Sequence, residues 1–514
     1  MNQAAAISMP PVPRWLGYIA ACVGMFMAIL DIQVVVTSLP TIEKALNIGP
    51  NLMSWVQTSY LIAEVIAIPL TGLLLRVFGM RHLFAVALTV FTLASVGCAS
   101  SSGFIDLLLW RVLQGAAGGV LIPMVFSGIF LLFPRGLQQT AATTLGGVLA
   151  VLAPTLGPIA GGWITEHFTW HWLFLINTAP GFVALVVGMF FLPRGELRLQ
   201  LLAGLDWLSL ALLGVGLAVF IIGLKEAPTE GWASLVVIFC FAIVAICGIW
   251  LWRRPKPAIM FYLLKDRPLL FGCILSFILG FALFGSVYLM PIFLAFVRGH
   301  GPLDIGLTIM VGGIAQLIVA PITVWLDRLF NARVLAAAGF LIFAIGLAMN
   351  AFLNTASDYD ALFWPQVVRG ISVGLCILPP IRFALAFMST EQVGDGSGLF
   401  NVARNIGGAI GIALIDTVIF MRGPDHVSAL MDLMKSDPSA AAGLMGIDVS
   451  ELPDAGDPTA LMGIMDQVQA VALTQAVNES WWMLAVVCVL ALPVLLWMGP
   501  IRAAMAPQKL NLKV

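Results

Sequence analysis

The chain has 514 residues, of which 61% are hydrophobic and 10% are charged, with a formal net charge of −1. A soluble domain usually carries about 25% charged residues, so the composition excludes an ordinary soluble protein, and the near-zero net charge does not suggest a nucleic-acid partner. Apolar runs long enough to cross a hydrocarbon core of about 30 Å recur along the whole chain. They predict an all-α polytopic membrane protein, because barrel strands would be about 10 residues long and would alternate in polarity.

Apolar runs separated by polar breaks predict fourteen membrane-spanning helices. In chain order they cover residues 15–39, 52–75, 80–100, 106–131, 138–164, 172–192, 206–224, 232–252, 269–292, 303–325, 333–353, 361–386, 396–420 and 480–500. The residues before the first run lack the charged region and cleavage site of a removable signal peptide. We therefore expect the first helix to be retained.

The distribution of Lys and Arg predicts the orientation, because these residues concentrate on cytoplasmic segments. With fourteen spans and the N-terminus inside, 16 of the 25 basic residues fall on inner segments and 5 on outer segments. An odd number of spans would scramble this alternation. The sequence therefore predicts that both termini are cytoplasmic.

One connection is far longer than the others. Residues 421–479 contain many acids and several prolines, together with amphipathic pieces such as VSALMDLMKS. A connection of this length is either disordered or functional. Met and Leu at helical spacing favour partial order, either as an amphipathic surface helix or as a segment that packs on a partner.

Two pairs of similar stretches indicate an internal repeat. Trp110–Pro123 resembles Pro365–Pro379, and Pro69–Leu83 resembles Pro321–Leu335. Duplicated halves are common in transporters, so the repeat predicts two six-helix halves with an inserted pair of helices between them. In chain order the first half, the inserted pair and the second half cover residues 1–193, 194–254 and 255–514.

Three stretches match signatures of a known family. LDIQVVVTSLPTI resembles a first-helix signature, RVLQGAAGG a fourth-helix motif, and APTLGPIAGGWI the antiporter motif of the fifth helix. The chain thereby resembles the major facilitator superfamily and, within it, the fourteen-helix drug:proton antiporters of the EmrB/QacA type. The resemblance implies the major facilitator fold, a bacterial inner-membrane location and an antiporter motif made of Pro154, Gly157, Pro158, Gly161 and Gly162.

The inner loop after the second helix departs from the family pattern. The family usually has an acid where this chain has Arg76, whereas Asp327 keeps an acid in the second half. The resemblance implies that these loops gate the cytoplasmic side, and it leaves open whether the gating ion pair forms in the first half. The candidate gating residues are Gly72, Arg76, Gly79, Arg81, Asp327 and Arg328.

Six charged residues are predicted at membrane depth, where a charge costs about 2.5–3.5 kcal/mol and needs a partner, an aqueous cavity or neutralisation. The residues are Asp31, Glu64, Asp416, Arg111, Arg369 and Arg404. Asp31 lies in the outer part of the first span and Arg111 near the outer end of the fourth, so their depths are compatible with contact.

A buried carboxylate that gains and loses a proton can couple transport to a proton gradient. We predict that Asp31, Glu64 and Arg111 form the proton-coupling set. The alternatives are a static ion pair at Asp31, and for Glu64 an anchor for cationic substrates or a carboxyl hydrogen-bonded between helices. Asp416 is a further candidate in the outer vestibule, and the sequence does not decide which of the three acids carries the proton.

Polar side chains within the spans predict the substrate cavity, because polar side chains that face lipid are unfavourable. The candidates are Gln33, Gln114, Gln366, Arg369, Asn401, Arg404 and Asp416.

No nucleotide-binding P-loop is recognisable, nor is any catalytic or metal-ligand cluster. We therefore expect no enzyme activity, no metal and no cofactor, and an ion gradient as the energy source. The residues and the resemblance together predict a proton-coupled exporter of hydrophobic or amphipathic small molecules. The alternative is an exporter of one defined metabolite, such as a siderophore or an amino acid. The resemblance also implies a periplasmic adaptor protein and an outer-membrane channel as partners.

Overall fold

The computed structural model describes residues 10–48, 52, 55–134, 136–203, 206–254, 261–385, 388–389, 392–452 and 458–497. The regular structure in these ranges is helical, and they contain no strand. The predicted all-α fold class is therefore confirmed. Thirteen helical segments of the described chain are long and apolar enough to cross a membrane.

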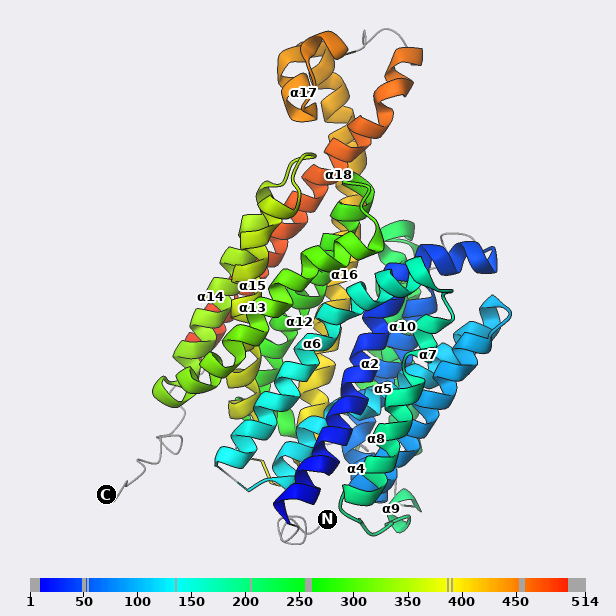
Figure 1. Ribbon diagram of the computed structural model, residues 1–514, viewed down its shortest axis with the longest axis vertical. Coiled ribbons are helices and arrows are strands. Elements are labelled where there is room, and N and C mark those ends of the chain that lie inside the picture. The colour runs from blue at the N-terminus through cyan, green and yellow to red at the C-terminus, as the bar shows by residue number, and fades with distance from the viewer. Residues whose placement is uncertain are drawn as a thin grey trace.

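The first group of helices runs up and down through one side of the bundle (Figure 1). It consists of α2 (Pro11–Leu46), α4 (Trp55–Ser100), α5 (Phe104–Leu132), α6 (Leu137–His167), α7 (Trp172–Leu175) and α8 (Thr178–Phe191).

The helix α4 contains two spans. It covers 46 residues, but Gly79 inside it has φ 70° and ψ 167°, a backbone conformation that glycine adopts readily and other residues avoid. Tyr60 and Cys98, near the two ends of α4, both lie beside the same part of α5, at Gly115 and Gln114. The chain therefore reverses at Gly79, and the thirteen segments provide the fourteen predicted crossings.

The inserted pair follows a short helix, α9 (Gln200–Ala203), and consists of α10 (Trp207–Glu230) and α11 (Leu235–Trp252). Side chains cap both long helices, since Asp206 accepts a hydrogen bond from the Ser209 backbone N–H and Ser234 accepts one from Val237. α10 lies against α4 and α16, whereas α11 packs mainly on α10 and exposes most of its apolar side chains.

The second group of helices forms the other side of the bundle. Its membrane helices are α12 (Arg267–Ile292), α13 (Pro302–Leu329), α14 (Ala332–Met349), α15 (Tyr359–Leu385), α16 (Val393–Ser436), α18 (Pro458–Val489) and α19 (Ala491–Trp497). The shorter elements are η1 (Phe261–Lys265), the π-helix η2 (Phe293–Val297), η3 (Asn350–Phe352), α17 (Pro438–Met445) and η4 (Val449–Glu451).

A helical protrusion extends from one end of the bundle (Figure 1). It consists of the C-terminal part of α16, α17, η4 and the N-terminal part of α18, and it has a small core of its own, made of Leu430, Met434, Ala441, Met445, Val468 and Val471. The described residues of the segment 421–479 are thus largely helical, in agreement with the partial order that the Met and Leu spacing favoured.

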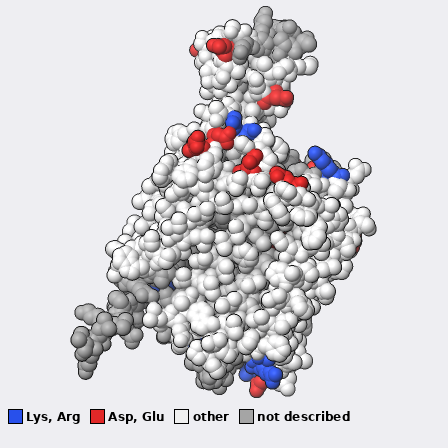
Figure 2. Space-filling view, in the orientation of Figure 1, with Lys and Arg blue, Asp and Glu red and all other residues white. Residues whose placement is uncertain are grey.

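Charged side chains gather at the two ends of the bundle. We call the end with the protrusion the protrusion end, and the opposite end, where α2 begins at Pro11 and α19 ends at Trp497, the terminal end. Figure 2 shows charged side chains gathered towards these ends, with an almost uncharged band between them. An apolar band of this kind is what a bilayer requires of the surface that faces lipid.

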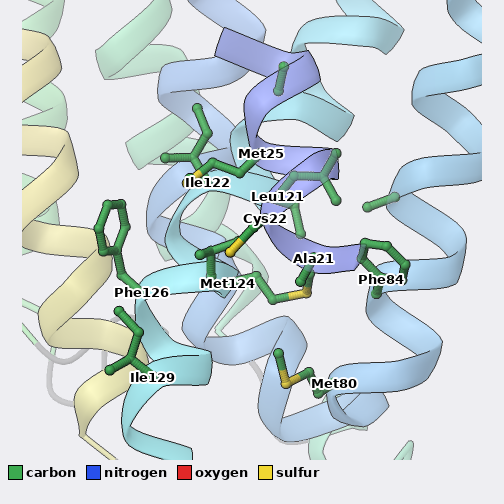
Figure 3. Close-up of a cluster of buried hydrophobic side chains, with 14 of the residues drawn as sticks. Ala21, Cys22, Met25, Met80, Phe84, Leu121, Ile122, Met124, Phe126 and Ile129 are labelled. Atoms are coloured by element: carbon green, nitrogen blue, oxygen red, sulfur yellow. The ribbon is translucent and has the colours of Figure 1, made fainter. Parts of the chain in front are cut away.

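The apolar core has two main clusters, and the first extends into the second group of helices, because it also contains Leu269 of α12, Ile381 of α15 and Phe400 of α16. In the first group, side chains of α2, α4 and α5 point towards one another, among them Cys22, Phe84 and Leu121 (Figure 3). The second group packs around a separate cluster that includes Phe340 and Trp481. The two groups meet along two seams, α4 against α16 and α6 against α13, and these seams border the candidate site.

Candidate functional site

The carboxylate of Asp31 on α2 lies where α2 meets α4, α5 and α8. Its Oδ2 accepts a hydrogen bond from Arg111 Nη1 at 2.5 Å, and its Oδ1 accepts from Gln114 Nε2 at 2.9 Å and from Asn177 Nδ2 at 2.8 Å. Asp31 exposes 1% of its surface and Arg111 exposes none. The two residues that the sequence placed at similar depth therefore meet as a fully buried ion pair. We call Asp31, Arg111, Gln114 and Asn177 the Asp31 network.

The guanidinium of Arg111 is surrounded by acceptors and aromatic rings. Its Nε donates to the Val56 carbonyl oxygen at 3.1 Å and its Nη1 to Gln114 Oε1 at 2.7 Å. It lies 4.4 Å from the ring centroid of Tyr60 and 5.7 Å from that of Phe174, where an aromatic face attracts a cation. Only Nη2 lacks a hydrogen-bond partner among the described residues.

The arrangement makes helix packing sensitive to the charge on one carboxylate. Protonation of Asp31 would remove the anion that balances the buried guanidinium of Arg111. An unpaired buried charge is strongly unfavourable, by about 3–5 kcal/mol when one partner of such a pair is removed. The network would therefore rearrange or admit water when Asp31 is protonated, and its four helices would shift with it.

Small residues bring α5 against α4 beside the Asp31 network. A Cβ at Gly115 would collide with the Tyr60 carbonyl oxygen, and a Cβ at Gly119 would approach the Glu64 carbonyl oxygen to 2.5 Å. Close approach of backbones through glycine is typical of helix contacts in membranes. Gly115 lies four residues after Arg111, so this contact also fixes the position of the arginine.

We expect Gly115→Val to destabilise the protein by about 1–3 kcal/mol, the cost of overpacking a close contact, because α4 and α5 must separate. The melting temperature of the purified protein measures this effect. Gly443→Val is the matched control, because a Cβ at Gly443 would meet no atom within 4 Å. Equal melting temperatures for the two variants would contradict the prediction.

A central cavity lies between the two groups of helices. The space between its lining side chains, counted together with the part that is open to solvent, is about 1760 Å³. Most of its lining is apolar and comes from both groups and from α10, including Ile32, Leu61, Ile122, Ile221, Phe284, Ile309, Val373 and Ile412. The cavity is therefore suited to molecules with a large apolar surface.

Four of the polar residues singled out in the sequence line this cavity: Gln33, Glu64, Arg369 and Arg404. Glu64 makes no ion pair among the described residues, although it is close enough to Arg404 for their charges to interact. Asp31 and Arg111 are not part of the lining. The structure thus separates the candidate acids into one enclosed network and one carboxyl at the cavity.

The remaining cavity candidates lie elsewhere. Gln114 belongs to the Asp31 network. Gln366 is fully buried next to Gly312, and neither of its amide atoms has a hydrogen-bond partner in the described part of the chain. Asn401 accepts a hydrogen bond from Arg404 Nη2 at 2.8 Å through its Oδ1. It therefore orients Arg404, which lines the cavity.

Asp416 is held by a tyrosine from the neighbouring helix. Its Oδ1 accepts a hydrogen bond from the Tyr288 hydroxyl at 2.7 Å. Tyr288 lines the cavity whereas Asp416 does not. The carboxylate therefore orients a cavity side chain rather than facing the cavity itself.

The predicted antiporter motif lies on α6, against α2 and the cavity. Pro154 and Pro158 line the cavity. A Cβ at Gly157 would collide with Gln33, and the Gly161 carbonyl oxygen accepts a hydrogen bond from the Ser38 hydroxyl at 3.4 Å. The next residue, Gly162, is buried. The motif thus forms both cavity wall and helix contact.

An ion pair joins the two groups at the terminal end. Arg76 Nη1 on α4 donates to Asp395 Oδ2 on α16 at 2.7 Å, and the side chain of Asp395 is fully buried while that of Arg76 is 25% exposed. A Cβ at Gly72 would collide with the Asp395 carboxylate. An ion pair is therefore present at this seam although the acid usual in the family is absent from the first half, with the base on α4 of the first group and the acid on α16 of the second.

The other gating candidates do not bridge the two groups. Arg81 Nε donates to the Leu192 carbonyl oxygen at 2.6 Å, and Gly79 packs against Gly195, so both tie α4 to the residues after α8. The side chains of Asp327 and Arg328 lie outside the described residues.

The second seam closes the protrusion end. A Cβ at Gly306 on α13 would come within 2.8 Å of the Ile159 backbone on α6. Ile159 lies within the antiporter motif, between Pro158 and Gly161. Contacts between the two groups are thus present on both sides of the central cavity, at Arg76–Asp395 and at Ile159–Gly306.

Three residues of the candidate site could not be identified from the sequence. Asn177 follows the short helix α7, Tyr288 lies within an apolar run, and Asp395 lies one residue before the predicted start of its span. A polar residue inside or beside an apolar run was the available signal in each case. Only their partners, which are distant in sequence, give these residues a role.

Comparisons with known proteins all indicate the same family. The family model described as Major Facilitator Superfamily matches residues 21–412. The colistin resistance protein EmrB of Acinetobacter baumannii is 33% identical over 490 residues, which cover 93% of this chain and 95% of the relative. The multidrug export protein EmrB of Escherichia coli K12 is 29% identical over 477 residues, covering 91% and 92%.

A solved structure shares the fold. The crystal structure of the human organic anion transporter MFSD10 (TETRAN) superimposes with a TM-score of 0.61 at 12% sequence identity, and the match covers 95% of this chain and all of that chain.

Proposed function

Because this chain belongs to the Major Facilitator Superfamily, we propose that it is a proton-coupled exporter of hydrophobic or amphipathic small molecules, drugs included. Relatives named for multidrug export and for colistin resistance support this assignment. Its apolar helices and its relatives make it a multi-pass protein of a bacterial inner membrane. Because it belongs to a family of transporters, we propose that it has no enzyme activity.

The observation that carries the proposal is the buried Asp31 network beside a large apolar cavity. An apolar cavity binds amphipathic molecules, and the carboxylate of Asp31 supplies a group whose charge controls the packing of four helices. A proton that reaches Asp31 from the acidic side would alter the contacts of Arg111 and favour a different arrangement of the helices. Export of substrate would then be driven by return of the proton.

The two groups of helices are proposed to move relative to each other around the cavity. Opening at the terminal end requires Arg76 and Asp395 to separate, and opening at the protrusion end requires α6 to leave α13 at Ile159 and Gly306. If one seam opens while the other stays closed, the cavity is exposed to one side of the membrane at a time. The limits of the two halves and the inserted pair, 1–193, 194–254 and 255–514, remain predictions from the sequence.

We further propose that the terminal end faces the cytoplasm and the protrusion faces the periplasm. Arg14, Arg76, Arg81, Arg194, Arg198, Arg253 and Arg254 lie towards the terminal end, in keeping with the preference of basic residues for the cytoplasmic side. The protrusion, with the exposed side chains of Leu444 and Val449, is the proposed contact for a periplasmic adaptor protein that leads to an outer-membrane channel.

Reconstitution into proteoliposomes tests the function. An imposed pH gradient should drive accumulation of amphipathic dyes, and substrate movement should in turn carry protons, which a pH-sensitive dye trapped inside the vesicles reports. Dissipating the gradient with an ionophore is the control. Dye movement that ignores the gradient, or no movement of any dye, would overturn the proposal.

A further inference from the structure

The charged side chains that face the central cavity are unbalanced. Among the described residues, the lining contains two guanidinium groups, Arg369 and Arg404, and one carboxyl group, Glu64. The Asp31–Arg111 pair lies outside the lining and carries no net charge. The charge presented to a bound molecule is therefore positive whether Glu64 is ionised or protonated.

Of the two arginines, Arg369 on α15 has the less negative charge near it to balance its own. Its side chain reaches towards α12, where Nη1 donates to the Ser286 carbonyl oxygen at 3.3 Å. No carboxylate forms an ion pair with it among the described residues, and the residue as a whole is 6% exposed. A buried charge normally has a partner, so the missing counter-charge at Arg369 indicates a place that an anion would fill.

Arg404 on α16 adds a second donor to the same cavity. Its Nη2 donates to Asn401 Oδ1, while its Nε is buried without an acceptor among the residues that the structure describes. The charge of Glu64 acts on Arg404, but the two side chains form no ion pair within the described part of the chain. Arginine presents a planar set of N–H groups that matches carboxylates, sulfonates and phosphates.

The surroundings of these bases are apolar. Leu283, Phe284, Val287 and Val373 line the cavity on α12 and α15, and charge–charge attraction is stronger beside apolar groups than in bulk water. A molecule with an apolar body and a negatively charged head would satisfy both features at once. A cationic molecule would have to bind close to two guanidinium groups with a single carboxyl for compensation.

We propose that the cavity selects anionic amphiphiles, and that Arg369 is the principal residue that binds the anionic head, assisted by Arg404. The proposal rests on the proposed transport function and specifies its substrate class. Because the Asp31 network lies outside the cavity lining, the bound anion and the proton at Asp31 occupy different sites.

Three probes of equal size test the selection: 1-naphthalenesulfonate, the N,N,N-trimethyl-1-naphthylammonium ion and 1-naphthalenemethanol. Binding is measured by equilibrium dialysis on the full-length protein in nanodiscs of phosphatidylcholine, which carry no net lipid charge. We expect the sulfonate to bind at least tenfold more tightly than the ammonium probe. Arg369→Gln should weaken sulfonate binding at least tenfold and leave binding of the neutral alcohol unchanged, which also shows that the variant is folded.

Two further variants sharpen the result. Glu64→Gln removes the carboxyl found among the described lining residues and should keep or strengthen sulfonate binding. Arg422→Gln, at an exposed arginine near the protrusion, should change nothing. Equal or tighter binding of the ammonium probe, absence of sulfonate binding, or equal weakening of all three probes by Arg369→Gln would overturn the selection. Gradient-driven transport of other dyes would then still stand, so the two proposals fail separately.

Discussion

Replacing Asp31 by Asn together with Arg111 by Gln will abolish the response of transport to a pH gradient while substrate binding persists. The double variant removes both charges of the buried pair, so it leaves no unpaired guanidinium in the helix junction. Removing only Asp31 would leave Arg111 buried without its partner, which costs about 3–5 kcal/mol and would confuse loss of coupling with loss of folding.

Two assays on the same proteoliposomes separate the effects. Substrate exchange at equal pH on both sides needs only the cavity, and we expect the double variant to keep it within about threefold of the parent. Accumulation driven by a pH gradient needs the titrating carboxyl, and we expect at least a tenfold loss, about 1.4 kcal/mol. Retention of gradient-driven accumulation by the double variant would remove Asp31 from the coupling role.

Glu64→Gln and Asp416→Asn are the matched comparisons, because each removes another carboxyl at membrane depth. Glu64 lines the cavity and Asp416 accepts a hydrogen bond from Tyr288. We expect both variants to keep gradient-driven accumulation of a neutral or anionic dye. If Glu64→Gln loses it and the double variant keeps it, the proton is carried at the cavity instead.

Reversing the charge at Arg76 will stop transport, and reversing its partner as well will restore it. Arg76→Asp places two carboxylates together at the α4–α16 seam, where Asp395 is fully buried. Like charges repel and neither is compensated there, so the terminal end will not close. We expect transport to fall at least tenfold in Arg76→Asp and in Asp395→Arg, and to recover to at least a third of the parent rate in the double exchange.

The surface pair of Arg198 and Glu196 provides the control. Their side chains are 54% and 86% exposed and 3.8 Å apart, and exposed pairs contribute little, about 0–1 kcal/mol. The corresponding charge exchange there should leave transport unchanged. If the double exchange at Arg76 and Asp395 stays inactive although the protein folds with the parent melting temperature, the ion pair is not the element that closes this end.

Membrane helices could be located from the sequence because the bilayer imposes a local rule on each of them. Every span must be apolar over about 20 residues, and the break at Gly79 stood out as a polar, glycine-containing gap between two such runs. The sequence also indicated that Asp31 and Arg111 lie at compatible depths for contact, because the depth of a residue in the membrane can be estimated from its distance along a span.

Rotation about the helix axis could not be read in the same way. A span that faces lipid on one side and protein on the other is apolar all round, so its sequence gives little sign of which way a polar residue points. Gln114 was therefore assigned to the cavity although it turns towards Asp31, and Asp416 although it turns towards Tyr288. Asp395 was overlooked because its partner, Arg76, is 319 positions away in the chain.

The helix α16 connects the two ends of the bundle. It is continuous over 44 residues, a length of about 66 Å at 1.5 Å per residue. It carries Asp395 near its start, Arg404 in its first third and part of the protrusion at its C-terminal end. A tilt of about 10° at the base would displace the far end by roughly 11 Å over that length. Separation of Arg76 and Asp395 at the terminal end would therefore move the protrusion at the opposite end of the bundle if α16 tilts as one body.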